Sequence, residues 1–208
     1  MNDDYIVKSE EELDAIFGEP HPLVQNKSSD SLDESMQEFI RRTPLICLST
    51  IDANGHVDVS PKGDAPGFVH IDDERNLLIP DRPGNKLVQG FRNLITNNGI
   101  GVIFIVPTMR ETFRIKGTAT IRRDPEILEK LGAEGKPALL CIHIKVEECF
   151  FHCGKAMIRS HMWKPNQWVK HKDSLLAANA AKRLNMEGDE ESKALEAQIE
   201  QAYVDTLY

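Results

Sequence analysis

The chain has 208 residues, of which 40% are hydrophobic and 28% are charged, and its formal net charge is -8. This length and composition are typical of one ordinary globular domain with appendages. The acidic balance argues against nucleic acid as the main partner, and no apolar run reaches the roughly 20 residues that span a bilayer. The N-terminus, Met1-Asn2-Asp3-Asp4, lacks the basic and apolar regions of a signal peptide, so we expect a cytoplasmic protein without a membrane partner.

Residues 1–43 are predicted to form a helical extension. A capping box at 9–12 precedes a helix that Gly18 ends. A second capping box at 31–34 precedes another helix, whose apolar stripe we expect to be buried. That stripe consists of Met36, Phe39 and Ile40.

The middle of the chain, residues 44–170, changes from helical to strand periodicity. Short alternating or apolar runs indicate strands at 45–51, 56–60, 68–71, 76–79, 100–106, 111–122 and 138–145, with 148–152 continuing the last strand past a bulge. Asn54-Gly55 is typical of a hairpin turn, and helices are predicted at 85–94 and after Asp124. The turns are short and no βαβ rhythm is present. We therefore predict a mainly β fold with helices, of the α+β class, in which about six antiparallel strands form a nearly closed barrel.

Residues 171–208 are predicted to form a polar helical tail. Helical spacing covers 175–184 and 190–207, with a break at Gly188. The narrow apolar stripe of the second segment is typical of packing against the core or against another subunit.

The four cysteines predict no metal centre and no disulfide framework. Cys47 and Cys141 lie in apolar strand-like runs, as buried reduced thiols do. Cys149, His152 and Cys153 would supply at most three ligands, and no second Cys or His pair has zinc-site spacing.

Four basic stretches lie at the ends of apolar runs, beside glycine or proline turns. They are 60–63, 81–86, 114–117 and 155–160. Fixed cations beside exposed backbone N–H groups are suited to a bound phosphate, and an acidic chain has no general surplus of cations. We interpret the four stretches as one anion pocket for a flavin nucleotide. Taken alone, Arg114 and Lys116, two apart on a strand, fit a solvated outer face equally well.

The residues around these stretches carry a resemblance to a known family. The segments are 43–50, 58–64, 80–86, 114–117 and 152–163. In order and spacing they resemble the pyridoxamine 5'-phosphate oxidase-like superfamily of FMN-binding split β-barrels, and within it the predicted flavin-nucleotide-binding branch. The resemblance implies a homodimer that holds FMN at the subunit interface.

The same resemblance implies the residues at the cofactor. Those lining the flavin ring and its pyrimidine edge would be Ser60, Pro61 and Lys62. Those holding the phosphate would be Arg82, Asn85 and Lys86, with Arg114 nearby. Those reaching across from the partner subunit would be Lys155, Arg159, Ser160 and Trp163. The arginine that the oxidase motif carries five positions before Lys62 is Val57 here, which speaks against pyridoxamine phosphate as the substrate.

The function expected from these residues is oxidoreduction through bound FMN. Hydride would move to or from flavin N5, with a small-molecule substrate and NAD(P)H as a candidate donor. His161, two residues before Trp163, is the candidate acid–base group. Two other functions stay open: a flavin carrier without turnover, and a haem-utilisation protein on the same barrel. A serine-nucleophile motif, a Walker loop and a dinucleotide fingerprint are absent from the sequence.

Overall fold

The computed structural model describes residues 3–170, 175–186 and 189–208. The strands are β1 (Leu45–Ile51), β2 (Val57–Gly63), β3 (His70–Ile71), β4 (Asn76–Pro80), β5 (Gly99–Ile105), β6 (Thr112–Arg122) and β7 (Cys141–His152). The helices are α1 (Glu10–Phe17), α2 (Pro22–Gln25), α3 (Glu34–Arg41), α4 (Gln89–Thr96), α5 (Pro125–Lys130), α6 (Lys155–Arg159), α7 (Leu175–Arg183) and α8 (Asp189–Asp205). Short 3-10 helices cover Asp3–Tyr5 and Pro165–Gln167.

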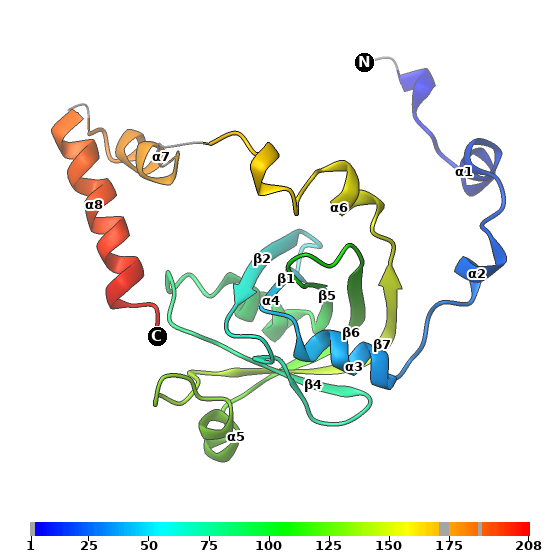
Figure 1. The fold of residues 1–208 in the computed structure, drawn as a ribbon, viewed down its shortest axis with the longest axis horizontal. Coiled ribbons are helices and arrows are strands. Elements are labelled where there is room, and N and C mark those ends of the chain that lie inside the picture. The colour runs from blue at the N-terminus through cyan, green and yellow to red at the C-terminus, as the bar shows by residue number, and fades with distance from the viewer. Residues whose placement is uncertain (1–2, 171–174, 187–188) are drawn as a thin grey trace.

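The strands form one antiparallel sheet that curls around the core, as Figure 1 shows. Within the described residues the sheet has seven strands, in the order β2-β1-β5-β6-β7-β4-β3. The predicted α+β fold of antiparallel strands with helices is confirmed. The seven strands agree with the expected barrel of about six, and β3, in the predicted run 68–71, is only two residues long. The β3–β4 hairpin also lies beyond β7 rather than beside β2, so the chain does not follow a simple meander.

Two local predictions for the strands are confirmed. Asp52 accepts hydrogen bonds from the amides of Asn54 and His56, and Gly55 has a φ of 87°, so this turn closes the β1–β2 hairpin. The predicted bulge in β7 lies at Glu147, because Lys116 is paired with Glu148 and the next residue of β6 with Val146.

The core fills the inner face of the sheet, where buried residues alternate along β1, β5 and most of β6. Its fully buried large side chains include Ile46, Leu48, Leu77, Ile79, Phe104, Phe113, Ile115, Ile142 and Ile144. Helix α3 packs against one end of this core through the predicted stripe, with the ring of Phe39 5.5 Å from that of Phe151. The N-cap of α3 is Asp33, which accepts from the Met36 amide, so the capping box predicted to begin at Ser31 was two residues early.

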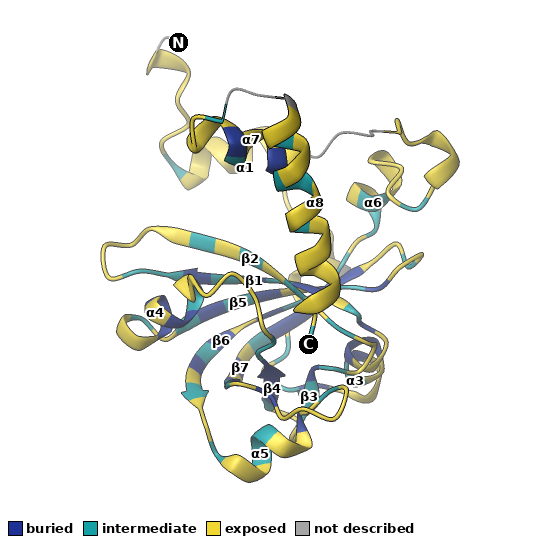
Figure 2. Cartoon of the chain, turned by 90° about the vertical axis from the view of Figure 1, so that its left-hand side faces the viewer, coloured by how far each residue is buried: buried dark blue, intermediate teal, exposed yellow. Residues whose placement is uncertain are grey.

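The helical extensions project from the barrel on two sides. Figure 1 shows α1 and α2 on one side and α7 with α8 on the other. Figure 2 shows that α8 is largely exposed, and α1 has no buried residue. The predicted cap at Ser9 and the predicted end at Gly18 are confirmed for α1, but its apolar residue Phe17 is 80% exposed. The break expected at Gly188 lies outside the described residues. The segmentation into 1–43, 44–170 and 171–208 stays a prediction, and α3, from the first of these segments, contributes to the common core.

Among the residues that the structure describes, no helix is both long enough and apolar enough to cross a bilayer.

Candidate functional site

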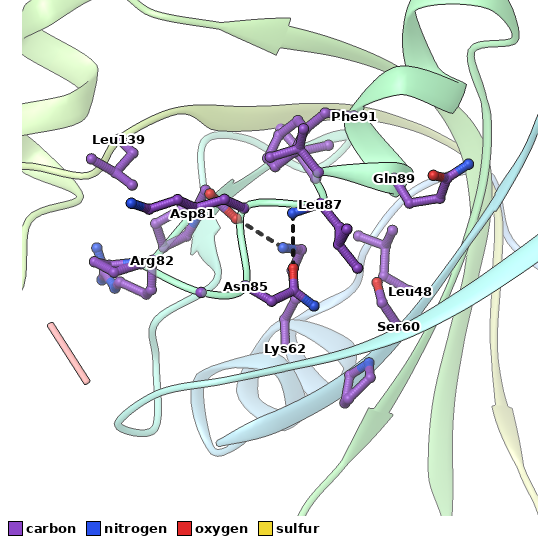
Figure 3. Close-up of a pocket in the computed structure, with 18 of the residues that line it drawn as sticks. Leu48, Ser60, Lys62, Asp81, Arg82, Asn85, Leu87, Gln89, Phe91 and Leu139 are labelled. Carbon is purple, nitrogen blue, oxygen red and sulfur yellow. Dashed lines mark hydrogen bonds and ion pairs between the residues drawn. The ribbon is translucent and has the colours of Figure 1, made fainter. Parts of the chain in front are cut away.

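A cavity lies between β2 and the segment that leads from β4 to α4. Its volume is about 810 Å³, within the usual range for small-molecule and cofactor sites. Figure 3 shows side chains from both segments converging on it. Its apolar wall consists of Leu48, Phe68, Pro80, Phe91, Leu139 and Ile142.

Strand β2 supplies one polar side of the cavity. β2 lies at an edge of the sheet, and its side chains alternate between the two faces as in any strand. Ser60 and Lys62 are paired with the buried residues Leu48 and Ile46 of β1, so both point to the inner side. Their spacing thereby places a hydroxyl and a cation in the cavity.

Lys62 is paired with Asp81 across the cavity. Its Nζ lies 2.9 Å from Oδ1 of Asp81, and the two side chains are 22% and 15% exposed. The ammonium also lies 5.3 Å from the centroid of the Phe91 ring, as in a cation–π contact. Lys62 therefore brings no unpaired charge to the site, although sequence reasoning treated it as a cation available to a ligand.

Arg82 is also neutralised, by a nearly buried carboxylate. Its Nε donates to Asp64 at 2.6 Å, and its Nη1 donates to the carbonyl of Leu131 at 2.8 Å. The Tyr208 hydroxyl donates to the other oxygen of Asp64 at 2.8 Å. Burial alone would raise the pKa of Asp64, but the hydrogen bonds from Arg82 and Tyr208 outweigh it and hold that pKa below its usual range.

The loop before α4 provides the other polar end. Sequence periodicity predicted a helix from residue 85, but α4 begins at Gln89, because the preceding loop has left-handed backbone at Lys86 (φ 60°) and Val88 (φ 49°). A β-branched residue in this conformation is an outlier, and such strain is concentrated at functional sites. Asn85 fixes the loop by accepting from the Leu87 amide at 3.0 Å.

The N-terminus of α4 opens onto the same cavity. Gln89, Gly90 and Phe91 all line it, and the N-cap residue Val88 makes no side-chain capping hydrogen bond. The first amides of a helix carry partial positive charge and lack partners within the helix. These amides, and Lys86 of the loop before the helix, which also lines the cavity, are the groups of this segment that suit an anion.

The structure brings six of the sequence-predicted residues to this cavity. They are Ser60, Pro61, Lys62, Arg82, Asn85 and Lys86. Asp81 was not predicted as a site residue, although it lies inside one of the basic stretches, because that pattern is defined by its cations. Asp64, the last residue of the segment 58–64, is the partner of Arg82.

Arg114 lies on the opposite face of the sheet. Pairing across the strands forms a row on that outer face, with Cys47, Ile103, Arg114 and Phe150, and the row begins at Pro61 on the edge strand beside the cavity. Three strand spacings separate Arg114 from Pro61, which is about 15 Å. Its guanidinium lies 5.3 Å from the centroid of the Phe150 ring. Within one chain, Arg114 is therefore not part of the cavity.

The segment around α6 does not reach this cavity within one chain either. The Trp163 indole donates a hydrogen bond to the Met109 carbonyl at 2.6 Å. The backbone of Gly154 lies so close to Arg110 that an added Cβ would overlap it. These two contacts hold the segment against the β5–β6 turn. Its predicted cofactor-binding residues are Lys155, Arg159, Ser160 and Trp163. His161 has a φ of 54°, is exposed, and lies in the same segment. The proposed roles of these residues stay predictions.

Comparison with solved structures finds proteins similar to the barrel part of this chain. HupZ from Group A Streptococcus is 20% identical, with a TM-score of 0.48, over 58% of this chain and 93% of its own. An FMN-binding protein from Syntrophomonas wolfei is 11% identical, with a TM-score of 0.41, over 55% and 86%. HutZ, a haem storage protein from Vibrio cholerae, is 14% identical, with a TM-score of 0.41, over 59% and 96%.

No curated protein matches the chain. The family described as pyridoxamine 5'-phosphate oxidase matches residues 32–153, which include α3 and every strand of the sheet. That match covers more than half of the sequence, and the chain therefore belongs to the pyridoxamine 5'-phosphate oxidase family.

Proposed function

We propose that the protein binds FMN in the cavity between β2 and α4 and acts as an oxidoreductase on a small molecule. The observation that carries this proposal is the polarity of one cavity, which has a cationic end at α4 and an apolar wall beside it. A flavin mononucleotide has the same two parts, an anionic phosphate and a flat apolar ring. When bound, FMN supplies the chemistry of hydride and electron transfer.

The phosphate end fits the α4 loop. Lys86 supplies a cation on a loop whose other predicted ligand, Asn85, is already positioned by its hydrogen bond to the Leu87 amide. The unpaired first amides of α4 add donors and a favourable dipole. Arg82 makes a smaller contribution in this proposal, because its Nε and Nη1 are engaged by Asp64 and Leu131.

The ring end fits the apolar wall. Phe91 and Ile142 would exclude water from the faces of the ring, while the Ser60 hydroxyl and the Lys62 ammonium offer donors at its polar edge. These residues bind and orient the ring. We assign no acid–base step to His161, which is the remaining candidate, because it lies on the α6 segment rather than in the cavity.

We further propose that the outer face of the sheet is the homodimer interface. Val57 and Val59 of β2 are 64% and 62% exposed, and Ile103 of β5 is 37% exposed. Exposed apolar residues on one face of a sheet mark a surface that another chain can cover. A second copy on this face would bring Arg114 and the α6 segment, with Lys155, Arg159, Ser160 and Trp163, toward its partner's flavin.

Haem is a poorer fit to this cavity. Among the described residues that line it, none is a histidine, cysteine, methionine or tyrosine, which are the axial ligands of haem iron.

A flavin carrier without turnover needs the same binding residues as an oxidoreductase. The two differ in whether NADH or NADPH reduces the bound flavin.

The binding proposal can be tested with Lys86→Ala and a matched control, Lys130→Ala, which removes an exposed lysine of α5. Fluorescence titration with FMN should give a dissociation constant at least about tenfold higher for Lys86→Ala, because a charge-assisted hydrogen bond contributes about 1.5–3 kcal/mol. The Lys130→Ala protein should bind like the wild type. Equal dissociation constants for all three proteins would show that the phosphate does not bind at the α4 loop.

A further inference from the structure

We propose that Asp81, held by Lys62, recognises the imide edge of the bound ring and so selects flavin-type rings. An imide edge is an N–H flanked by two carbonyl groups, as at N3 of isoalloxazine. The inference rests on the proposed function and assigns a cofactor-selecting role to an acidic residue that lies within one of the basic stretches.

The pair presents an acceptor and a donor side by side. Asp81 uses Oδ1 for Lys62, and the described hydrogen bonds leave its Oδ2 available. The Lys62 ammonium has three N–H donors, of which Asp81 takes one. Figure 3 shows both side chains directed into the cavity, beside Leu87 and Asn85. A ligand edge that offers an N–H next to a carbonyl oxygen would satisfy both groups at once.

The position of Asp81 is fixed by the fold. It directly follows β4, and its amide donates to the Leu140 carbonyl at 2.8 Å. Lys62 is held by its strand and by its contact with the Phe91 ring. Groups fixed before binding lose little conformational entropy when the ligand arrives, so the pair is preorganised for recognition.

The charges of the pair exclude the phosphate from this end of the cavity. A carboxylate repels a phosphate dianion, and Lys62 already has its charge balanced by Asp81. The phosphate therefore belongs at Lys86 and α4, and the ring extends from there toward Asp81. A deazaflavin carries the same imide edge and would be accepted, whereas the carboxylates of a haem would be repelled.

The test compares FMN with N3-methyl-FMN, which has lost the imide N–H. The proteins are the wild type, Asp81→Ala, and Asp58→Ala, which removes another carboxylate lining the same cavity. Flavin fluorescence gives the dissociation constants. In the wild type and in Asp58→Ala, methylation should weaken binding at least about tenfold, the effect of one charge-assisted hydrogen bond. In Asp81→Ala, FMN should bind more weakly and methylation should make no further difference.

Asp81→Asn keeps an acceptor oxygen without the charge, so its methylation penalty should lie between those of the wild type and Asp81→Ala. It also serves as the test if Asp81→Ala does not fold. An equal penalty in the wild type and in both Asp81 variants would overturn the inference and leave FMN binding intact. Failure of the wild type to bind either flavin would overturn the proposed function, and the inference with it.

Discussion

The Arg82–Asp64 ion pair gives the sharpest test of how the cavity is held together. Arg82→Met keeps most of the side-chain volume but removes the guanidinium. It leaves the Asp64 carboxylate, whose side chain is only 5% exposed, with the Tyr208 hydroxyl and a backbone amide as partners. Breaking a buried pair costs about 3–5 kcal/mol, and Arg82 is 18% exposed, so we expect a loss of about 3 kcal/mol in the free energy of unfolding.

The loss of stability in Arg82→Met should also change with pH in a definite direction. In the wild type the pKa of Asp64 is depressed, so its stabilisation is present above the unfolded value of about 3.9 and is lost as the pH falls through the folded pKa. In Arg82→Met the burial of Asp64 would dominate and raise its pKa. Protonation of Asp64 would then neutralise the unpaired charge. The difference in the free energy of unfolding between wild type and Arg82→Met should therefore shrink as the pH falls from about 7 towards about 4.

Urea denaturation at fixed protein concentration measures both effects. Adding Asp64→Asn to Arg82→Met removes the unpaired carboxylate and should restore most of the lost stability. A deficit below about 0.5 kcal/mol, the level of a surface pair, would refute the reasoning. So would a further loss in the double variant.

Two further predictions test the sheet and the thiols. An added Cβ at Gly117 would overlap the Lys145 carbonyl at the bulge, so Gly117→Ala should lower the free energy of unfolding by more than about 2 kcal/mol. In the control variant Gly101→Ala the added Cβ would make only ordinary contacts, so the loss should be far smaller. Thermal or urea unfolding of both variants checks this. Burial raises the pKa of Cys141 and Cys149 to about 11, so these two thiols should react slowly with a thiol reagent in the native protein near pH 8. Cys153 is exposed and should react in a fast phase, which the Cys153→Ser variant should lack. Fast labelling of the two buried thiols would contradict this burial.

Local patterns predicted the elements of this fold well. Alternation along 45–51 and 111–122 matches β1 and β6 within a residue, and the Asp124-Pro125 start matches α5. Each of these depends on a few neighbouring residues. The start of α4 could not be predicted, because Lys86 and Val88 adopt a conformation that their residue types disfavour, and only tertiary contacts can impose it.

Partners that are distant in the chain were harder to predict. The cavity end of β2 and the loop after β4 were both identified as basic, and they do meet. Lys62 and Asp81 are 19 residues apart, and Asp64 and Arg82 are 18 apart, so their neutralisation depends on how the strands are arranged. Alternation on β6 placed Arg114 and Lys116 on a common face, but could not say that this face lies opposite the cavity.

The most direct test of FMN binding is a fluorescence titration of the purified, flavin-free protein with FMN. We predict saturable quenching of flavin emission with one FMN per chain, accompanied by the flavin absorbance band near ~450 nm in the isolated complex. A protein that takes up no FMN at any concentration would contradict the assignment of this cavity.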